Sequence, residues 1–189
     1  MLSALSLPFN NINDIKMDKG DDGRSVLHRS ALLGCWQTLF FLSGEIQKDV
    51  NSLDILGETA LSYALRNNTS IPRLDTYICV SALIMMGADV NRIGTNRLSP
   101  LMLAVLMNDV HLVDLLLKYN ADINYRYSTE NDVLCIPNKS TALSLACSFT
   151  KNAKIVESLM AYKARIHLHV LFHAIQKADA DVKPLLLKN

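Results

Sequence analysis

The sequence is poor in the residue types that build glycine-rich loops, disulfide scaffolds and metal knuckles. Its 189 residues include 7 glycines, 5 prolines and 4 cysteines, and no two cysteines form a C-x-x-C pair. Cysteines so few and so widely separated argue against a zinc knuckle or a disulfide-stapled fold, and they favour a reducing compartment such as the cytoplasm. Phosphate-loop, dinucleotide-fold, serine-hydrolase and zinc-protease signatures are also missing. The sequence therefore predicts neither an enzyme nor a cofactor site.

The sequence also lacks an excess of charge and a long apolar run. Lysine and arginine number 19 against 18 aspartate and glutamate residues, which gives a formal net charge of +1. Without a run of like charges, neither nucleic acid nor a membrane surface is expected as a partner. No stretch reaches the roughly 20 apolar residues that cross a bilayer. Residues 1–9 lack the basic region that precedes the apolar part of a signal peptide.

What the sequence does contain is an internal repeat. Residues 88–91 read Ala-Asp-Val-Asn, and residues 121–124 read Ala-Asp-Ile-Asn 33 positions later. Residues 49–51 are a shorter copy, Asp-Val-Asn. Four similar openings, each followed by small residues, begin at residues 23, 57, 97 and 139. Self-similarity at such a period is the signature of a stacked repeat fold.

Each repeat is predicted to be a pair of helices. Ser or Thr starts the first helix well because the hydroxyl accepts a hydrogen bond from an orphan backbone N–H. Ser99 is followed by Pro100, which has no N–H to lose at the first helical position. In the second helix apolar residues recur at helical spacing, as at Leu112, Val113 and Leu116. One pair cannot bury this stripe alone, so neighbouring pairs must stack.

The openings and endings resemble the ankyrin-repeat family, whose repeat begins with G-x-T-P-L-H-x-A and closes with G-A-D-V-N. The resemblance implies an all-α fold, an ankyrin-repeat solenoid of about four to five helix-turn-helix repeats with β-hairpin-like connecting loops. It assigns residues 1–19 to an N-terminal capping segment and residues 20–189 to the ankyrin-repeat domain. The repeats are expected at about 20–52, 53–92, 93–126 and 136–167, with a terminal half-repeat at 168–189.

Ankyrin-like proteins bind partner proteins through the exposed side of the first helices, which lines a concave face, and through the hairpins between repeats. Carried onto this chain, the positions expected to contact a partner are Leu32, Leu33, Ile55, Leu56, Arg66, Asn67, Leu98, Leu106, Met107 and Phe149. Most of them are apolar, and an exposed apolar stripe usually marks a contact site. If the repeat boundaries are slightly misjudged, some of these side chains belong to the core instead.

The connection at residues 125–139 is longer than a standard one. Connections of this length are commonly functional or disordered. Tyr and Arg are the residue types that dominate protein-binding hot spots. We therefore expect an extended hairpin in which Tyr125, Arg126 and Tyr127 contact the partner.

Other conspicuous residues receive structural interpretations. His28 occupies the family's histidine position, which ties neighbouring loops together, and Cys79 and Cys147 fall at small buried apolar positions. In the histidine cluster at 167, 169 and 173, His169 and His173 are four residues apart and could share a helix face, as a zinc pair does. No carboxylate or cysteine lies near them in sequence until Asp179, so no metal is predicted. The family's hairpin asparagines, expected to form structural hydrogen bonds, are Asn51, Asn91 and Asn124.

The sequence thus predicts a monomeric protein-protein interaction adaptor or scaffold that binds a partner protein in a reducing cell interior. Similar arrays occur in proteins that bacteria and viruses deliver into host cells, so a pathogen effector acting in a host cell is one form of this role. The alternative is a targeting module of a longer protein whose separate enzymatic domain is not in this chain.

Overall fold

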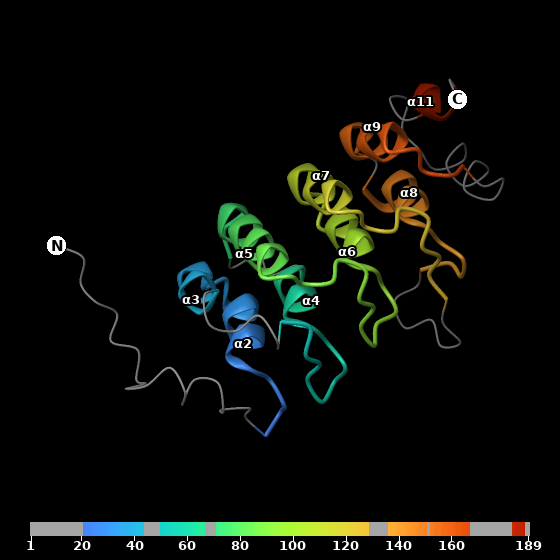
Figure 1. Ribbon diagram of the computed structural model, residues 1–189. Coiled ribbons are helices and arrows are strands. Elements are labelled where there is room, and N and C mark those ends of the chain that lie inside the picture. The colour runs from blue at the N-terminus through green and yellow to red at the C-terminus, as the bar shows by residue number, and fades with distance from the viewer. Residues whose placement is uncertain are drawn as a thin grey trace.

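The computed structural model describes residues 21–43, 50–66, 71–128, 136–150, 152–166 and 183–187. These residues form an elongated stack of helix pairs, with α2 and α11 at opposite ends (Figure 1). The described part of the chain contains helices, turns and loops and no strand. The prediction of an all-α solenoid is confirmed.

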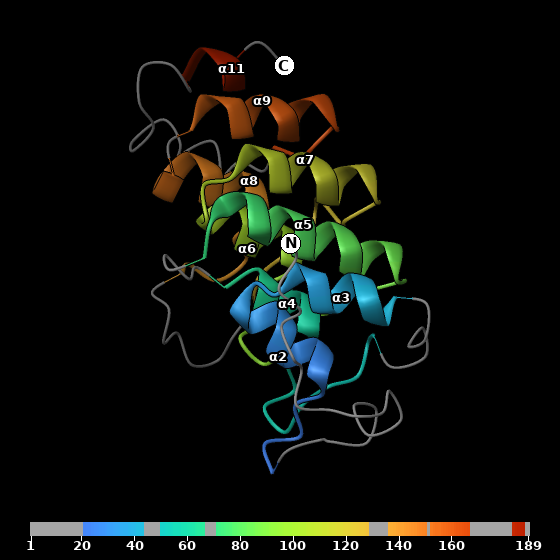
Figure 2. The same cartoon turned by 90° about the vertical axis from the view of Figure 1, so that its left-hand side faces the viewer.

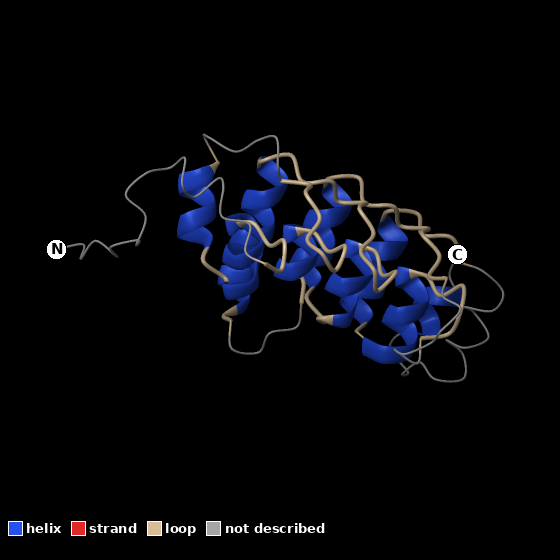
Figure 3. Ribbon diagram, turned by 90° about the horizontal axis from the view of Figure 1, so that it is seen from below, coloured by secondary structure: helices blue, strands red, loops and turns tan. Residues whose placement is uncertain are grey.

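The helices lie in two layers. The first helices of successive repeats are α2 (Val26–Leu33), α4 (Ala60–Ala64), α6 (Pro100–Leu106) and α8 (Ala142–Leu145), which continues into the π-helical turn η1 (Ala146–Thr150). The second helices are α3 (Trp36–Leu42), α5 (Arg73–Met85), α7 (Val110–Lys118) and α9 (Ala153–Ala161), followed by α11 (Lys183–Leu187). Each helix packs on its counterpart in the next repeat, and Figure 2 shows the second helices as one row. The connecting loops gather along one side of the stack (Figure 3).

The first helices begin at the predicted hydroxyl residues. The Thr59 hydroxyl accepts a hydrogen bond from the Ser62 backbone N–H at 3.1 Å, and the Ser99 hydroxyl accepts one from the Met102 N–H at 3.2 Å. Thr141 caps α8 through the backbone N–H of Ser144 in the same way. These bonds satisfy backbone donors that have no partner within the helix.

The core lies between the two layers. The stripe predicted for the second helix of the third repeat is fully buried, with Leu112, Val113 and Leu116 at 0% exposure. Cys79 and Cys147 are buried in the same core, as their positions in the repeat predict. Burial of one stripe requires the neighbouring repeat, so the stack folds as a unit whose stability depends on its interfaces.

Polar side chains fix the register between repeats. The Asn51 side chain accepts a hydrogen bond from the Asp89 backbone N–H at 2.7 Å and donates one to the Gly87 carbonyl at 3.0 Å. Asn91 forms the same pair of bonds one repeat later, and Asn124 accepts from the Arg165 N–H at 2.9 Å. The structural role predicted for the three asparagines is confirmed.

His28 links two neighbouring loops. Its imidazole is buried, and Nε2 lies 3.1 Å from the carbonyl oxygens of both Ser52 and Glu58. Nδ1 lies 2.8 Å from the hydroxyl of Ser25, which precedes α2. The histidine therefore connects the first repeat to the loop of the second, as its position in the motif predicts.

Candidate functional site

A buried carboxylate shapes the loop before α4. Oδ1 of Asp54 accepts hydrogen bonds from the backbone N–H groups of Leu56 and Glu58, each at 2.9 Å. Oδ2 accepts a hydrogen bond from the hydroxyl of Tyr63 at 2.6 Å and lies 3.4 Å from Nε of Arg24. Burial acts to raise the pKa of Asp54, but the hydrogen bonds, led by that from Tyr63, outweigh it and hold the pKa below its ordinary value. The charged carboxylate thus stabilises the hairpin conformation.

This hairpin presents apolar side chains to solvent. Ile55 is 70% exposed and Leu56 is 49% exposed, and Leu53 beside them is also exposed. The chain turns back at Gly57, whose φ of 68° lies in the left-handed region that favours glycine. Residues 53–56, called the hairpin tip below, therefore form an apolar surface on a backbone that Asp54 holds in place.

Side chains at the ends of the first helices differ in exposure. Leu33, Arg66 and Phe149 are exposed, as the repeat pattern predicts. Phe149 lies in η1, where the helix widens into a π-helical turn. The partly buried side chains, which also pack against the core, are those of Leu32, Leu106 and Met107. Asn67 lies outside the described residues.

The expected exposure of Leu98 is wrong. Its side chain is only 4% exposed. Leu98 directly precedes Ser99, the residue that caps α6, and an apolar side chain at this position packs back onto the helix that follows. Glu58 and Ser140 hold the same place before their own cap residues, and both are buried. The position belongs to the interior of the stack in these repeats.

The expected exposure of Tyr127 is also wrong, since its side chain is 2% exposed. The Tyr127 backbone N–H donates to the Ser140 carbonyl at 2.8 Å, and the Lys139 N–H donates to the Tyr127 carbonyl at 2.8 Å. These bonds close the base of the long connection and draw Tyr127 into the core. Tyr125 is partly buried and donates its hydroxyl to the Arg97 carbonyl at 2.9 Å, while Arg126 is exposed.

Arg66 was predicted as a contact residue, but the sequence did not indicate that it and Arg24 both lie against one aromatic ring. The guanidinium carbon of Arg66 lies 4.3 Å from the centroid of the Tyr63 ring, and that of Arg24 lies 4.8 Å from it. A cation over an aromatic face is attracted by the ring quadrupole. The buried ring therefore orients Arg66 near the end of the first helix. A Tyr three residues before an Arg in a short predicted helix is the signal that indicates such a contact.

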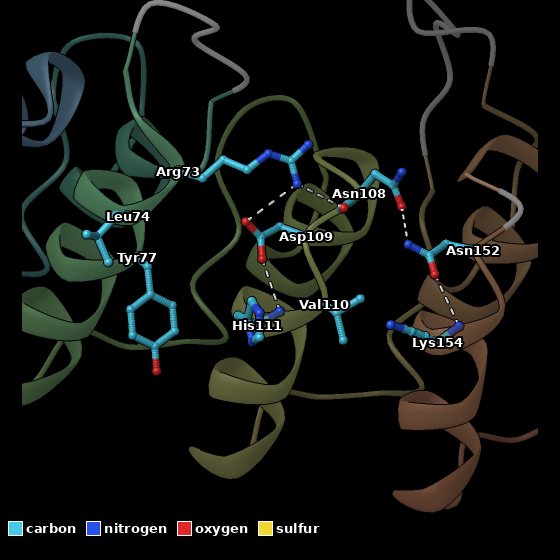
Figure 4. A pocket seen from close by; sticks show the side chains of 9 residues that line it. All are labelled: Arg73, Leu74, Tyr77, Asn108, Asp109, Val110, His111, Asn152 and Lys154. Carbon is cyan, nitrogen blue, oxygen red and sulfur yellow. Dashed lines mark hydrogen bonds and ion pairs between the residues drawn. The ribbon is translucent and has the colours of Figure 1, made fainter.

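A hollow on the second-helix layer was missed as well (Figure 4). It has a volume of about 800 Å³ and is lined by residues at the N-terminal ends of α5, α7 and α9. Arg73 reaches over from α5 and donates to the Asn108 carbonyl at 3.4 Å. Asn108 in turn accepts a hydrogen bond from the Asn152 side chain at 2.7 Å. These residues come from three different repeats, so only stacking brings them together.

Comparison with known protein families identifies the repeats. The family model for ankyrin repeats in three copies matches residues 27–127 and again residues 76–170, more than half of the chain. The chain belongs to the ankyrin-repeat family.

Two curated ankyrin-repeat proteins are similar to parts of it. The ankyrin repeat protein YahD of Escherichia coli strain K12 is 33% identical over 76 residues, which are 40% of this chain and 34% of that protein. The ankyrin repeat protein FPV031 of fowlpox virus strain NVSL is 29% identical over 111 residues, which are 58% of this chain and 29% of that protein. The matches thus span about a third of the length of each relative.

Metal-ligating and nucleophilic side chains are two kinds of group that could carry out chemistry in the described part of the chain. No group of three His, Cys, Asp or Glu residues that could hold a metal ion occurs there. Burial raises the pKa of Cys79 and of Cys147 to about 12, which suppresses the reactive thiolate at neutral pH. The histidine cluster at 167–173 lies outside the described residues.

Ankyrin repeats are in general protein-protein interaction modules, and the family is generally non-enzymatic. Among the helices that the structure describes, none is long and apolar enough to span a membrane.

Proposed function

We propose that this ankyrin-repeat chain is an adaptor that binds a partner protein through the hairpin tip and the exposed ends of the first helices. The supporting observation is the hairpin tip itself, where Ile55 and Leu56 face solvent on a backbone anchored by Asp54. Exposed apolar side chains on a backbone that is already ordered favour binding, because covering them costs little backbone entropy.

The proposed contact surface includes further exposed side chains at the ends of the first helices. Leu33 and Phe149 add apolar area at the ends of α2 and η1, and Arg66 adds a positive charge oriented by Tyr63. Aromatic and arginine side chains are the usual anchors of protein interfaces. Arg126 is the member of the long connection that we retain as a contact residue, because it is exposed while Tyr127 is buried.

A binding comparison with a matched control tests the proposal. The Ile55→Ser/Leu56→Ser double variant removes the apolar tip, whereas Met85→Ser changes a side chain that is 71% exposed at the end of α5 in the other layer. Affinity capture followed by mass spectrometry should recover a partner with the wild type and the control but not with the double variant. An identical partner set for all three proteins would refute the proposal.

A second candidate function is recognition on behalf of a longer protein, with this chain as its targeting module. The observation that favours it is the length of the fowlpox virus relative: the 111 matched residues are 29% of that protein, so it is about twice as long as this chain. The cytoplasmic location, the monomeric state and a role in a host cell stay predictions.

A further inference from the structure

The hollow in Figure 4 is one end of a longer groove. A second hollow of about 500 Å³ lies further along α7 and is lined by α7 and α9 residues, including Leu115, Lys118 and Tyr162. Both hollows are lined by Tyr77 and His111, so they adjoin each other along α7. Helix α7 has 9 residues, which at ~1.5 Å per residue makes the groove about 13 Å long. An extended peptide of about four residues spans that length at ~3.3 Å per residue.

The charge that faces solvent at the α7 N-terminal end of this groove is positive. Arg73 and Lys154 line this end, and the Arg73 side chain is 72% exposed. Asp109 also lines it, but its carboxylate is engaged. Oδ1 accepts hydrogen bonds from the N–H groups of His111 at 3.0 Å and Leu112 at 3.3 Å.

The other Asp109 oxygen, Oδ2, lies 4.0 Å from Arg73. At this distance the pair is weak and leaves most of the guanidinium to solvent. Two cations with one buried carboxylate between them attract an anionic group from a partner.

The rest of the groove is apolar or neutral. Leu74 is exposed and Val110 and Tyr77 are partly buried beside the two cations. At the far end Asp114 and Lys118, four residues apart on α7, balance each other's charge. The groove therefore combines a cationic end with a remainder that is partly apolar and has no net charge.

We propose that this groove is a second protein-docking site, which binds an extended segment of a partner protein. The segment carries an Asp or Glu side chain at the Arg73 and Lys154 end and an apolar or aromatic side chain towards Leu115 and Tyr162. The site lies on the second-helix layer, so it is separate from the hairpin tip and leaves that surface free. A chain with both sites can hold two proteins at once.

The test uses synthetic peptides of defined composition. Each is an acetylated and amidated hexapeptide with one Asp or Glu and one Leu, Phe or Tyr within four positions, the remainder being Gly and Ser. Each has a twin in which Asn or Gln replaces the acid. Fluorescence polarisation should detect an acidic peptide that binds the wild-type protein, and its twin should bind about tenfold more weakly, because two exposed charge pairs contribute up to ~1 kcal/mol each.

Matched variants assign that binding to the groove. The Arg73→Gln/Lys154→Gln double variant should bind the acidic peptide about tenfold more weakly than the wild type does. Its affinity for the amide twin should be unchanged. Arg92→Gln removes an exposed charge that lies outside the groove and should have no effect. Because the substituted side chains are exposed, all variants should keep the wild-type melting temperature.

Several outcomes would overturn the docking site. One is the absence of binding by every acidic peptide at about 1 mM, which corresponds to a binding free energy near −4 kcal/mol. Others are equal binding of acid and amide twins, and binding that the double variant does not change. Competition by inorganic phosphate at the peptide's own concentration would indicate a small-anion site instead. Dimerisation of the wild type that the double variant abolishes would indicate a second copy of the chain. None of these results depends on the hairpin tip.

Discussion

The side-chain oxygen of Asn91 accepts a hydrogen bond from the backbone N–H of Asp122 at 2.7 Å, across 31 residues of sequence. The Asn91 amide donates in return to the Asn120 carbonyl at 3.1 Å. One side chain thus holds the third repeat on the second, and Asn51 and Asn124 act in the same way at the neighbouring junctions.

Replacing Asn91 with Ala should destabilise the stack by about 1 kcal/mol, because two hydrogen bonds are lost but water can reach the groups left behind. Arg92→Ala, at the exposed neighbouring position, is the control and should change the unfolding free energy by less than about 0.5 kcal/mol. Urea denaturation measures both. Equal effects of the two substitutions would show that Asn91 does not couple the repeats.

Tyr127 should behave as a core residue rather than a contact residue. Tyr127→Ala removes a buried aromatic ring and should cost about 3–5 kcal/mol. The exposed neighbour Ser128 provides the control, since Ser128→Ala should change stability by less than about 0.5 kcal/mol. Chemical denaturation of both variants decides between the two interpretations of this tyrosine. A Tyr127→Ala variant as stable as the control would place the ring at the surface.

The repeat openings, the helix caps and the hairpin asparagines could be predicted because each depends on a few residues close in sequence. Ser99 and Thr59 are residue types that commonly cap helices, and Asn91 lies at the end of the recurring Ala-Asp-Val-Asn motif. The burial of Leu98 was missed although its place directly before the Ser99 cap is a local signal for it, because the position was assigned to the exposed hairpin by the repeat pattern alone. The groove along α7 was missed because Arg73, Asp109 and Asn152 come from three repeats and form no motif in the sequence.

The Asp54 carboxylate should make stability depend on pH. Its pKa is below the ordinary 3.8 in the folded protein, so the folded state binds a proton less readily than the unfolded state. Its contribution is therefore fully present at pH values above that ordinary pKa and is lost as the pH falls through the lower folded pKa.

The Asp54→Asn variant tests this dependence. At pH 7 it should be less stable than the wild type by about 1–3 kcal/mol, because the Asn amide faces the donors Tyr63 and Arg24. The gap should narrow below about pH 4, as the wild-type carboxylate gains its proton. Asp21→Asn, at an exposed position, serves as the control. A stability gap that is independent of pH would contradict the assignment.

Side chains at the ends of the first helices should differ in how much they contribute to stability. Leu33→Ser should change the unfolding free energy by less than about 0.5 kcal/mol, since the side chain is exposed. Leu106→Ser should cost about 1–3 kcal/mol, because Leu106 is partly buried against the core. Thermal or urea denaturation of the pair measures the contrast. If Leu106→Ser were as mild as Leu33→Ser, Leu106 would belong to the contact surface alone.

Site-specific photo-cross-linking tests most directly the claim that the hairpin tip contacts a partner. A photoreactive phenylalanine derivative is placed at Ile55 in one protein and at Met85 in another, two exposed positions in different layers. If the hairpin tip contacts the partner, position 55 should form a covalent adduct with the captured partner and position 85 should form none. An adduct at position 85 alone, or equal adducts at both positions, would contradict that contact.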